Sequence, residues 1–416
     1  MIQLIQAVIE DNFVPIQSWI DKKKQTIPQV LYSSVDLRQS SHKIASIDTN
    51  LFPAGFNNLC HDNHASLQQE LHAYIQTNYT NAQSILLFCE DHTRNTYYLE
   101  NIYQLKNILE GAGYKVTIAT YFNDHPNICA SNGYLNLDTA FGHALTIYCL
   151  DYIQRHGTIF SFDLCLLNND LTEGKLLALQ DLDIPMVPSL SFGWHARKKS
   201  EHILLLNKIT ESMVLDCGLD LDPWLLSTLV SPVLEIDINQ SSHRQIAADA
   251  AANLLAKLAQ KYKEHNISDT PYLVLKSDNG TYGMGVITVE TPDDILNLNR
   301  KKRNKLSKGK ASLPIEKLIL QEGVPSVHST NNMVSEEVLY QCNGATVGGF
   351  FRMHPTKSKK DILNATGMVF KSFCNDSHAL CSSEITACGV AQDISKTSYV
   401  LAQLANLSAQ HELAPC

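Results

Sequence analysis

The sequence predicts a mixed fold in which an open, largely parallel α/β sheet is followed by an α+β lobe. Two strand–helix–strand patterns, over residues 84–120 and 162–188, indicate the parallel sheet. After a strongly helical stretch at residues 244–265, short strands alternate with glycine-containing loops, which is typical of an α+β arrangement. The chain has 416 residues, 44% of them hydrophobic, which is long enough for two or three packed lobes.

The first strand–helix–strand pattern begins with the short apolar run Ser84–Cys89. Apolar side chains then recur at helical spacing until Gly111 and Gly113, which predict the end of the helix before a strand at residues 115–120. The second pattern predicts strands at residues 162–167 and 184–188 with a helix at residues 176–182 between them.

Further strands are expected near both ends of the chain. Residues 34–38 and 47–50 alternate as the two strands of a hairpin do. The strands expected after the long helix lie at residues 272–276, 286–289, 317–321, 338–341 and 346–353. We therefore divide the chain into residues 1–80 with the hairpin, 81–240 with the parallel sheet, and 241–416 with the α+β lobe.

Composition argues against several classes of function. The formal net charge of -9 works against broad attraction to phosphate backbones, so no nucleic-acid partner is expected. No apolar run approaches the roughly 18–20 residues that cross a bilayer, and the N-terminus lacks the basic region of a signal peptide. The 11 cysteines are scattered without a C-x-x-C pair, which favours reduced thiols and a cytoplasmic location.

A lysine at the end of a predicted strand, Lys276, precedes a polar turn rich in glycine. Small residues let backbone N–H groups approach phosphate oxygens, and the lysine supplies a compact positive charge. An ordinary structural turn is the alternative, and a Walker loop is excluded because a strand follows the turn. The predicted phosphate contacts are Lys276, Gly280, Thr281, Tyr282, Gly283 and Gly285.

The next predicted strand ends in Gln321, Glu322 and, after a glycine, Val324. Adenine is an apolar disc with a hydrogen-bonding edge, so a nucleotide site needs an apolar floor and a short backbone segment that contacts this edge. The end of this strand can provide both, although in isolation an ordinary strand end is the commoner explanation.

Two pairs of polar residues mark the N-terminal hairpin. Residues two apart on a strand share a face, which groups Asp36 with Arg38 and Asp48 with Asn50. Oxygen ligands on adjacent strands suit Mg²⁺, which proteins commonly hold with one or two carboxylates and nucleotide phosphates. A surface ion pair explains the spacing equally well.

Three other basic features are candidates for binding. Arg352 ends an apolar strand, where a guanidinium can clamp a carboxylate or phosphate, and a loop with Asn364 and Thr366 follows. For the segment 194–199, which contains a tryptophan and three basic residues, a surface patch at a helix start is favoured over contact with substrate. The basic run 300–310 is interpreted as a solvated loop, with a nucleic-acid patch as the alternative.

Together these segments resemble the ATP-grasp ligases of the eukaryotic glutathione synthetase type, in the same order along nearly the whole chain. That resemblance implies an ATP-grasp fold in permuted order, with a Rossmann-like substrate domain at residues 81–240 and the grasp lobe at 241–416. The step from Asp36 to Asp48 and Asn50 is similar to the magnesium triad of glutathionylspermidine synthetases, which makes these residues metal ligands. Aspartate stands at 48 where the synthetases have glutamate, and the turn lacks their triple glycine.

Three segments look more specifically like the proteobacterial glutamate–cysteine ligases that are unrelated to the enterobacterial enzyme. They are residues 37–43, 48–58 and 276–285. The resemblance implies ATP-dependent formation of γ-glutamylcysteine through a γ-glutamyl phosphate, the first step of glutathione biosynthesis, with ATP and Mg²⁺ as cofactors. The partners implied are glutamate, cysteine and ATP, and a homodimer is the assembly considered.

By this resemblance Lys276 and Arg352 are the catalytic side chains, and substrate is bound by Arg38, Arg352, Asn364 and Thr366. Two alternatives stay open. One is glutathione synthetase or another amino-acid or peptide ligase of the same fold, and the other is a non-catalytic nucleotide-binding regulator.

Overall fold

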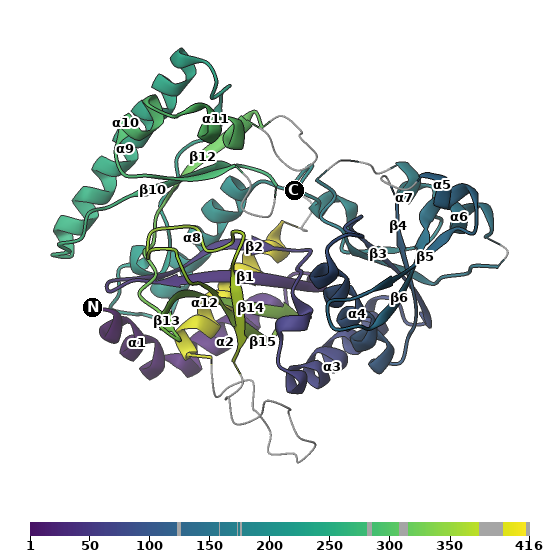
Figure 1. Cartoon of the computed structure of the whole chain (residues 1–416). Helices are drawn as coiled ribbons and strands as arrows, with labels where there is room; N and C mark the ends of the chain where they lie inside the picture. Colours follow the sequence, from purple (N-terminus) through teal and green to yellow (C-terminus); the bar gives the residue numbers. More distant parts are fainter. Residues whose placement is uncertain are drawn as a thin grey trace.

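The computed structural model describes residues 1–122, 126–157, 159–172, 174, 177–280, 285–307, 315–373 and 394–412. Three β-sheets organise these residues into three neighbouring lobes (Figure 1). An antiparallel sheet lies centrally, a mostly parallel sheet lies to one side, and a small antiparallel sheet lies above. Among the described residues, no helix is long and apolar enough to cross a membrane.

The central sheet joins the two ends of the chain. Its strands run in the order β16-β15-β14-β1-β2, with β13 paired to β14, and all the pairings are antiparallel. Their bounds are β1 Tyr32–Gln39, β2 Ile44–Asn50, β13 Ser329–Thr330, β14 Met333–Cys342, β15 Ala345–His354 and β16 Val369–Ser372. The C-terminal helix α12 (Lys396–His411) packs on this sheet and contacts α1 (Ile2–Asp11) and α2 (Phe13–Lys24).

On β1, Val35 and Leu37 point to the core that contains α12, as does Leu339 opposite Val35 on β14. The alternate residues of β1, which include Asp36 and Arg38, therefore face the opposite side of the sheet. This alternation separates a packed face from a face that carries the charged residues.

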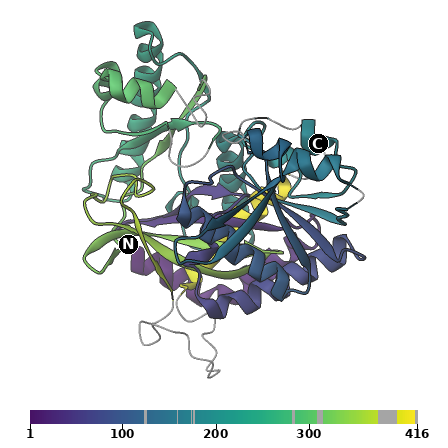
Figure 2. The same cartoon turned by 45° about the vertical axis from the view of Figure 1, so that its right-hand side comes forward.

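The second sheet has the order β5-β6-β4-β3-β7-β8, and all its pairings are parallel except that of β5 with β6. Its strands are β3 Ser84–Cys89, β4 Lys115–Thr120, β5 Tyr134–Asp138, β6 Ala144–Cys149, β7 Leu164–Asn168 and β8 Met186–Val187. The helices of this lobe are α3 His61–Asn78, α4 Thr96–Gly111, α5 Pro126–Ala130, α6 Leu150–Arg155 and α7 Leu177–Gln180. Figure 2 brings this lobe forward.

The third sheet is antiparallel, in the order β11-β10-β12-β9. Its strands are β9 Leu234–Glu235, β10 Leu273–Ser277, β11 Val286–Val289 and β12 Lys317–Glu322. The helices α9 (Ser241–Glu264), α10 (Pro292–Leu296) and α11 (Arg300–Ser307) lie with it. Helix α8 (Lys199–Asp216) connects the lobes by packing on α12. Single 3-10 turns occur at Phe56–Asn58, Leu190–Phe192 and Pro223–Leu226.

The mixed α/β fold is confirmed, and two predicted strands, at residues 84–89 and 115–120, have the observed bounds. The residues assigned to the middle region divide between lobes, because α8 packs on α12 and β9 pairs with β12 of the third sheet. The expectation that the thiols are all reduced is wrong, since Cys60 and Cys149 each take part in a disulfide bond. Within the described part of the chain, the free cysteines are Cys89, Cys165, Cys217 and Cys342.

Candidate active site

The charged face of the central sheet holds most of the residues predicted from the hairpin and the C-terminal strand. Strand register places Asp36 opposite Asp48, and Glu336 opposite Arg352. Because residues paired across strands share a face, carboxylates and guanidinium groups from β1, β2, β14 and β15 gather on one side. The two hairpins lie far apart in sequence, with 316 positions separating Asp36 from Arg352, so only the sheet topology brings their charged groups together.

A four-membered ion network occupies this face. Arg352 donates from Nη1 to Asp36 Oδ2 at 2.7 Å and to Glu336 Oε1 at 2.8 Å. Arg38 donates from Nε to Glu336 Oε2 at 2.6 Å. Burial alone would raise the pKa of Glu336, but Arg38 and Arg352 hold that pKa below its usual range. The Asp36–Arg38 surface pair considered from the spacing does not form, since Asp36 instead pairs with Arg352.

One edge of the Arg352 guanidinium still has hydrogen-bond donors that are not fully used. Its Nε is buried without a hydrogen-bond partner among the described residues, and its Nη2 lies 3.5 Å from Asp36 Oδ1, a long contact. Nε and Nη2 form the edge that binds a carboxylate with two parallel hydrogen bonds. Arg352 is therefore fixed by Asp36 and Glu336 and still has donors for an anion.

Asp48 is surrounded by positive charge. Lys199 donates from Nζ to Asp48 Oδ1 at 2.6 Å. Burial alone would raise the pKa of Asp48, but Lys199 and then Lys276 keep it well below the usual range. Asp36 shows the opposite direction, because burial raises its pKa more than Arg352 lowers it. The two opposed carboxylates are thus in different electrostatic surroundings.

Lys276 reaches this face from β10 of the third sheet. Its Nζ donates to the carbonyl oxygen of Ile47 at 3.1 Å, and its side chain is 6% exposed. Burial lowers the pKa of Lys276 to about 8, with Asp48 opposing that effect. The lysine predicted to bind phosphate therefore lies beside the predicted metal hairpin, although the two are more than 200 residues apart in sequence.

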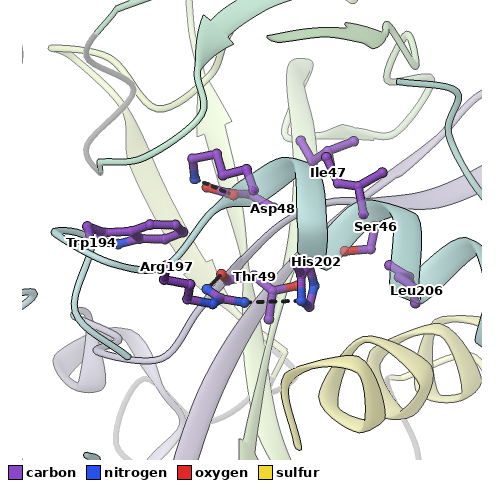
Figure 3. Close-up of a pocket in the computed structure, with 10 residues that line it drawn as sticks. Ser46, Ile47, Asp48, Thr49, Trp194, Arg197, His202 and Leu206 are labelled. Carbon is purple, nitrogen blue, oxygen red and sulfur yellow. Dashed lines mark hydrogen bonds and ion pairs between the residues drawn. The ribbon is translucent and has the colours of Figure 1, made fainter. Parts of the chain in front are cut away.

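Residues preceding and opening α8 complete the site. Trp194, Arg197 and Lys199 line a small pocket with Asp48 and His202 (Figure 3). The Lys199 Nζ lies over the Trp194 ring at 4.1 Å. The expectation of a surface patch here is wrong, since Trp194, Arg197 and Lys199 are 2%, 6% and 7% exposed. These side chains are buried because they pack between α8, β2 and the end of α12.

The Arg197 guanidinium holds this pocket together. It donates to the carbonyl oxygen of Thr49 at 2.5 Å and to Glu412 Oε2 at 2.7 Å. Glu412 also lies 2.6 Å from His202 Nδ1. Burial favours a raised pKa for Glu412, yet Arg197 and His202 lower it to about 2. The end of α12 is therefore tied to the strand that carries Asp48.

The end of β12, predicted to contact adenine, has its side chains engaged internally. Glu322 accepts from Lys43 Nζ at 2.6 Å and from Trp224 Nε1 at 3.0 Å, and Gln321 donates to Thr228 Oγ1 at 2.9 Å. Both Lys43 and Glu322 are fully buried. Val324 is buried as well. The backbone is engaged as well, since Glu322 N donates to the carbonyl oxygen of Leu229 and Gly323 N to that of Tyr272, both at 2.8 Å.

The glycine-rich turn after β10 is described at its two ends. Gly280 and Gly285 both have positive φ, of 100° and 66°, which favours glycine. Thr281, Tyr282 and Gly283 lie outside the described residues. At the base of the turn, Asp278 accepts from the backbone N and Oγ of Ser200 at 2.8 and 3.0 Å. The turn is thereby anchored to the first residues of α8.

The predicted substrate loop after β15 contacts the network through Arg38. The Arg38 Nη2 donates to the carbonyl oxygen of Asp361 at 2.7 Å. Within the loop, Asn364 is partly buried and Thr366 is exposed, and the carbonyl oxygen of Thr366 lies 3.0 Å from His354 Nε2. The structure therefore joins this loop to the charged face, but leaves the Thr366 side chain directed to solvent.

The donor set on the hairpin fits Mg²⁺ in chemical type. Asp36 and Asp48 offer carboxylate oxygens from neighbouring strands, and Asp48 is 39% exposed. The amide of Asn50 is closed on its own turn, since its Oδ1 accepts from Phe52 N at 3.0 Å. In the described part of the chain, no three His, Cys, Asp or Glu side chains form a metal cluster. The arrangement suits an ion that also takes phosphate and water ligands.

Sequence reasoning missed Glu336 and Lys199. Glu336 precedes the strand expected at residues 338–341, but β14 begins at Met333 and places Glu336 opposite Arg352. Extending the alternation two residues back would have found it. For Lys199 the sequence offers one signal, a tryptophan close to three basic residues. We interpret that combination in the sequence as a surface patch.

Comparison with known proteins adds independent information. The family model for glutamate-cysteine ligase (GshA) matches residues 6–413. The crystal structure, at 1.90 Å resolution, of a provisionally named gamma-glutamylcysteine synthetase from Methylobacillus flagellatus KT is 32% identical. That match covers 99% of this chain and 95% of the other, with a TM-score of 0.84.

A more distant match is D-alanyl-alanine synthetase A of Vibrio cholerae O1 biovar eltor, at 13% identity over 71% of this chain and 77% of that one. Its TM-score of 0.30 is too low to support a conclusion. No curated protein sequence matches the chain. Because the family model covers nearly its whole length, the chain belongs to the glutamate–cysteine ligase family of ATP-dependent ligases.

Proposed function

We propose that the chain joins the γ-carboxylate of glutamate to the amine of cysteine on the charged face of the central sheet, in an ATP-grasp arrangement. The observation that carries this proposal is the meeting of Lys276 from the third sheet with the hairpin that bears Asp36 and Asp48. The groups proposed to bind phosphate, metal and a carboxylate then lie at one place, as ligation through an acyl phosphate requires.

The proposed reaction has two steps. An oxygen of the glutamate γ-carboxylate attacks the terminal phosphorus of ATP, forming γ-glutamyl phosphate and releasing ADP. The cysteine amine then attacks the acyl carbon, loses a proton, and expels inorganic phosphate as the amide forms. Catalysis comes from positioning and charge neutralisation, and no covalent enzyme intermediate is needed.

Arg352 is proposed to hold a substrate carboxylate. Its open Nε and Nη2 edge supplies two donors, while Asp36 and Glu336 fix the other side of the guanidinium. Arg38 contributes by holding Glu336 and the loop that contains Asn364 and Thr366. We propose that this loop contacts the second substrate.

The nucleotide is proposed to lie between the third sheet and the central sheet. Lys276 would neutralise phosphate oxygens, and the backbone of the turn from Gly280 through Thr281, Tyr282 and Gly283 to Gly285 would cover them. At the end of β12, Gln321, Glu322 and Val324 are proposed to contact the adenine, for which Gln321 and Glu322 would have to exchange existing hydrogen bonds.

Asp36, Asp48 and Asn50 are proposed to hold Mg²⁺, which when bound would neutralise charge on the ATP phosphates. Asp48 would exchange its contact with Lys199 for the metal. Asn50 would have to open its turn with Phe52 to contribute its amide oxygen.

The proposed substrates are small molecules, with no nucleic-acid or membrane partner. We place the reaction in the cytoplasm, where ATP and reduced cysteine are both available, and propose a homodimer as the assembly to be tested by light scattering.

The decisive measurement is ADP release with two substrate pairs. Glutamate plus cysteine should support turnover, and γ-glutamylcysteine plus glycine should not. Turnover with the second pair alone would identify a glutathione synthetase. ATP binding without turnover in either assay would identify a nucleotide-binding regulator, and both outcomes would overturn the proposal.

A further inference from the structure

We propose that Lys199 is a tethered counter-ion that keeps free divalent metal off Asp48, so that metal enters the site together with nucleotide phosphates. The inference rests on the proposed function, because it takes Asp48 as a metal ligand. It adds a role for a lysine that the motifs did not identify.

The first observation is the ion pair itself. Lys199 Nζ lies 2.6 Å from Asp48 Oδ1, and the lysine side chain is 8% exposed while that of Asp48 is 39% exposed. A cation at this distance occupies a coordination position of the carboxylate. The greater exposure of Asp48 leaves its other oxygen accessible to an incoming ion.

The second observation is that Lys199 is held rigidly. Its backbone N donates to the carbonyl oxygen of Asp278 at 2.7 Å, and the Asp278 carboxylate caps the next residue, Ser200. Its ammonium lies over the Trp194 ring, 4.1 Å from the centroid. The lysine is thus fixed at both ends, unlike a surface lysine whose side-chain entropy weakens an ion pair.

The third observation is the charge balance around Asp48. On the described part of the charged face, four carboxylates, Asp36, Asp48, Asp278 and Glu336, are matched by four cations, Arg38, Lys199, Lys276 and Arg352. The formal charges of this group already balance, so a divalent cation arriving alone gains no net attraction from the group. Nucleotide phosphates bring the negative charge that supplies this attraction.

Binding of the two together then frees Lys199 from Asp48. The ammonium remains on the Trp194 ring and takes a phosphate or substrate oxygen as its new partner. In this scheme Lys199 controls the stage at which metal binds to Asp48. It is therefore a positioning residue for the reaction.

The test measures Mn²⁺ binding to the full chain by electron paramagnetic resonance, with and without adenylyl imidodiphosphate. In Lys199→Met the affinity for Mn²⁺ without nucleotide should rise at least about tenfold over the unsubstituted protein. Lys199→Arg keeps the charge and should leave this affinity within about twofold. Lys198→Met is the matched control, because Lys198 pairs with Glu201 on the surface of the same helix start.

An unchanged Mn²⁺ affinity in Lys199→Met would overturn the inference, as would an equal rise in Lys199→Arg. Circular dichroism and thermal melting establish that each variant is folded, and Lys199→Gln replaces the methionine variant if that one does not fold. Asp48→Asn distinguishes a failure of the metal assignment from a failure of the counter-ion role. If it leaves nucleotide-dependent Mn²⁺ binding unchanged, the metal assignment itself is wrong; if it abolishes that binding while Lys199→Met has no effect, only the counter-ion role fails.

Discussion

Lys276 donates a hydrogen bond from Nζ to the backbone carbonyl oxygen of Ile47, 3.1 Å away. Ile47 is the extra residue of a β-bulge, since Asp36 pairs with Asp48 while Leu37 pairs with Ser46. The bulge leaves Ile47 outside the ladder between β1 and β2, so its carbonyl oxygen is available to a side chain from another sheet. This contact joins the proposed phosphate and metal groups.

Replacing Lys276 by methionine tests the proposed phosphate contact. The substitution keeps the apolar stem but removes the charge that would neutralise phosphate oxygens in the transition state. We expect kcat to fall by about 100-fold or more, since loss of one preorganised charge contact costs on this scale. Steady-state ADP release measures the effect, and a variant retaining full kcat would contradict the assignment.

The lowered pKa of Lys276 predicts a pH dependence in binding. Its pKa of about 8 means that the charged form is lost as pH rises through that value. At saturating glutamate and cysteine, kcat/KM for ATP should therefore fall above about pH 8. In Lys276→Arg, which stays charged, the fall should shift to higher pH. An unshifted profile would assign the titration to another group.

The same group affects stability with the opposite sign. Between about pH 8 and 10.5 the unfolded lysine binds a proton that the folded lysine has released, so this residue makes folding more favourable as pH rises. Chemical denaturation of the unsubstituted protein and Lys276→Met across this range isolates the contribution as a difference. If the stability of the unsubstituted protein relative to Lys276→Met fell as pH rises over this range, a lowered pKa for Lys276 in the folded protein would be contradicted.

Regular parts of the fold were predictable because their patterns are local. The strands at 84–89 and 115–120 are apolar runs bounded by a helix and glycines. Helix α12 gave no comparable signal: Gln403, Asn406 and Gln410 are fully buried in it. They tolerate burial because the C-terminal helix packs on strands far away in sequence, where Gln403 bonds Gln341 at 2.7 Å and Asn406 accepts from Ser33 at 3.0 Å.

Individual residues of the candidate site could be predicted from the sequence, but the contacts between their side chains could not. Asp36, Asp48, Lys276 and Arg352 were all identified, because each has a chemically distinctive position on a strand. Their partners depend on register: Glu336 opposes Arg352 only because β14 starts at Met333, ahead of its apolar run. The pairing of Glu336 with Arg38, 298 residues away, has no local signature.

Glu336 provides a test of that network. Glu336→Gln removes the charge shared by Arg38 and Arg352, so both guanidinium groups lose orientation and KM for glutamate should rise about tenfold or more. Stability should fall by about 3 kcal/mol because Arg38 loses its carboxylate and Arg352 loses one of its two. Glu337→Gln is the matched control on the opposite face of the strand and should change KM little. Equal effects of the two substitutions would refute a specific role for Glu336.

The buried pair of Lys43 and Glu322 separates a structural role from nucleotide contact. Glu322→Gln leaves the Lys43 ammonium uncompensated, so we expect the free energy of unfolding to fall by about 3–5 kcal/mol. The double variant Lys43→Met/Glu322→Gln should recover most of this loss, because the glutamine oxygen can still accept from Trp224 Nε1 and Leu229 N, with KM for ATP within about threefold of the original. Urea denaturation and ATP titration check both parts. A large KM change in a fully stable double variant would indicate that the Glu322 side chain contacts nucleotide.

Asp48→Ala tests the hairpin as the metal site. Turnover should be lost while the fold is largely kept, because the Asp48 side chain is 39% exposed and its removal leaves only Lys199 without its partner.

The ion pair of Asp48 with Lys199 also predicts a pH effect. The lowered pKa of Asp48 stabilises the folded state above the unfolded carboxyl pKa, and that stabilisation is lost as pH falls towards the folded value. Asp48→Ala should therefore lose less stability on acidification than the unsubstituted protein. Full activity in this variant would remove the metal assignment, and identical acid denaturation curves would contradict the proposed electrostatic role of Lys199 and Lys276.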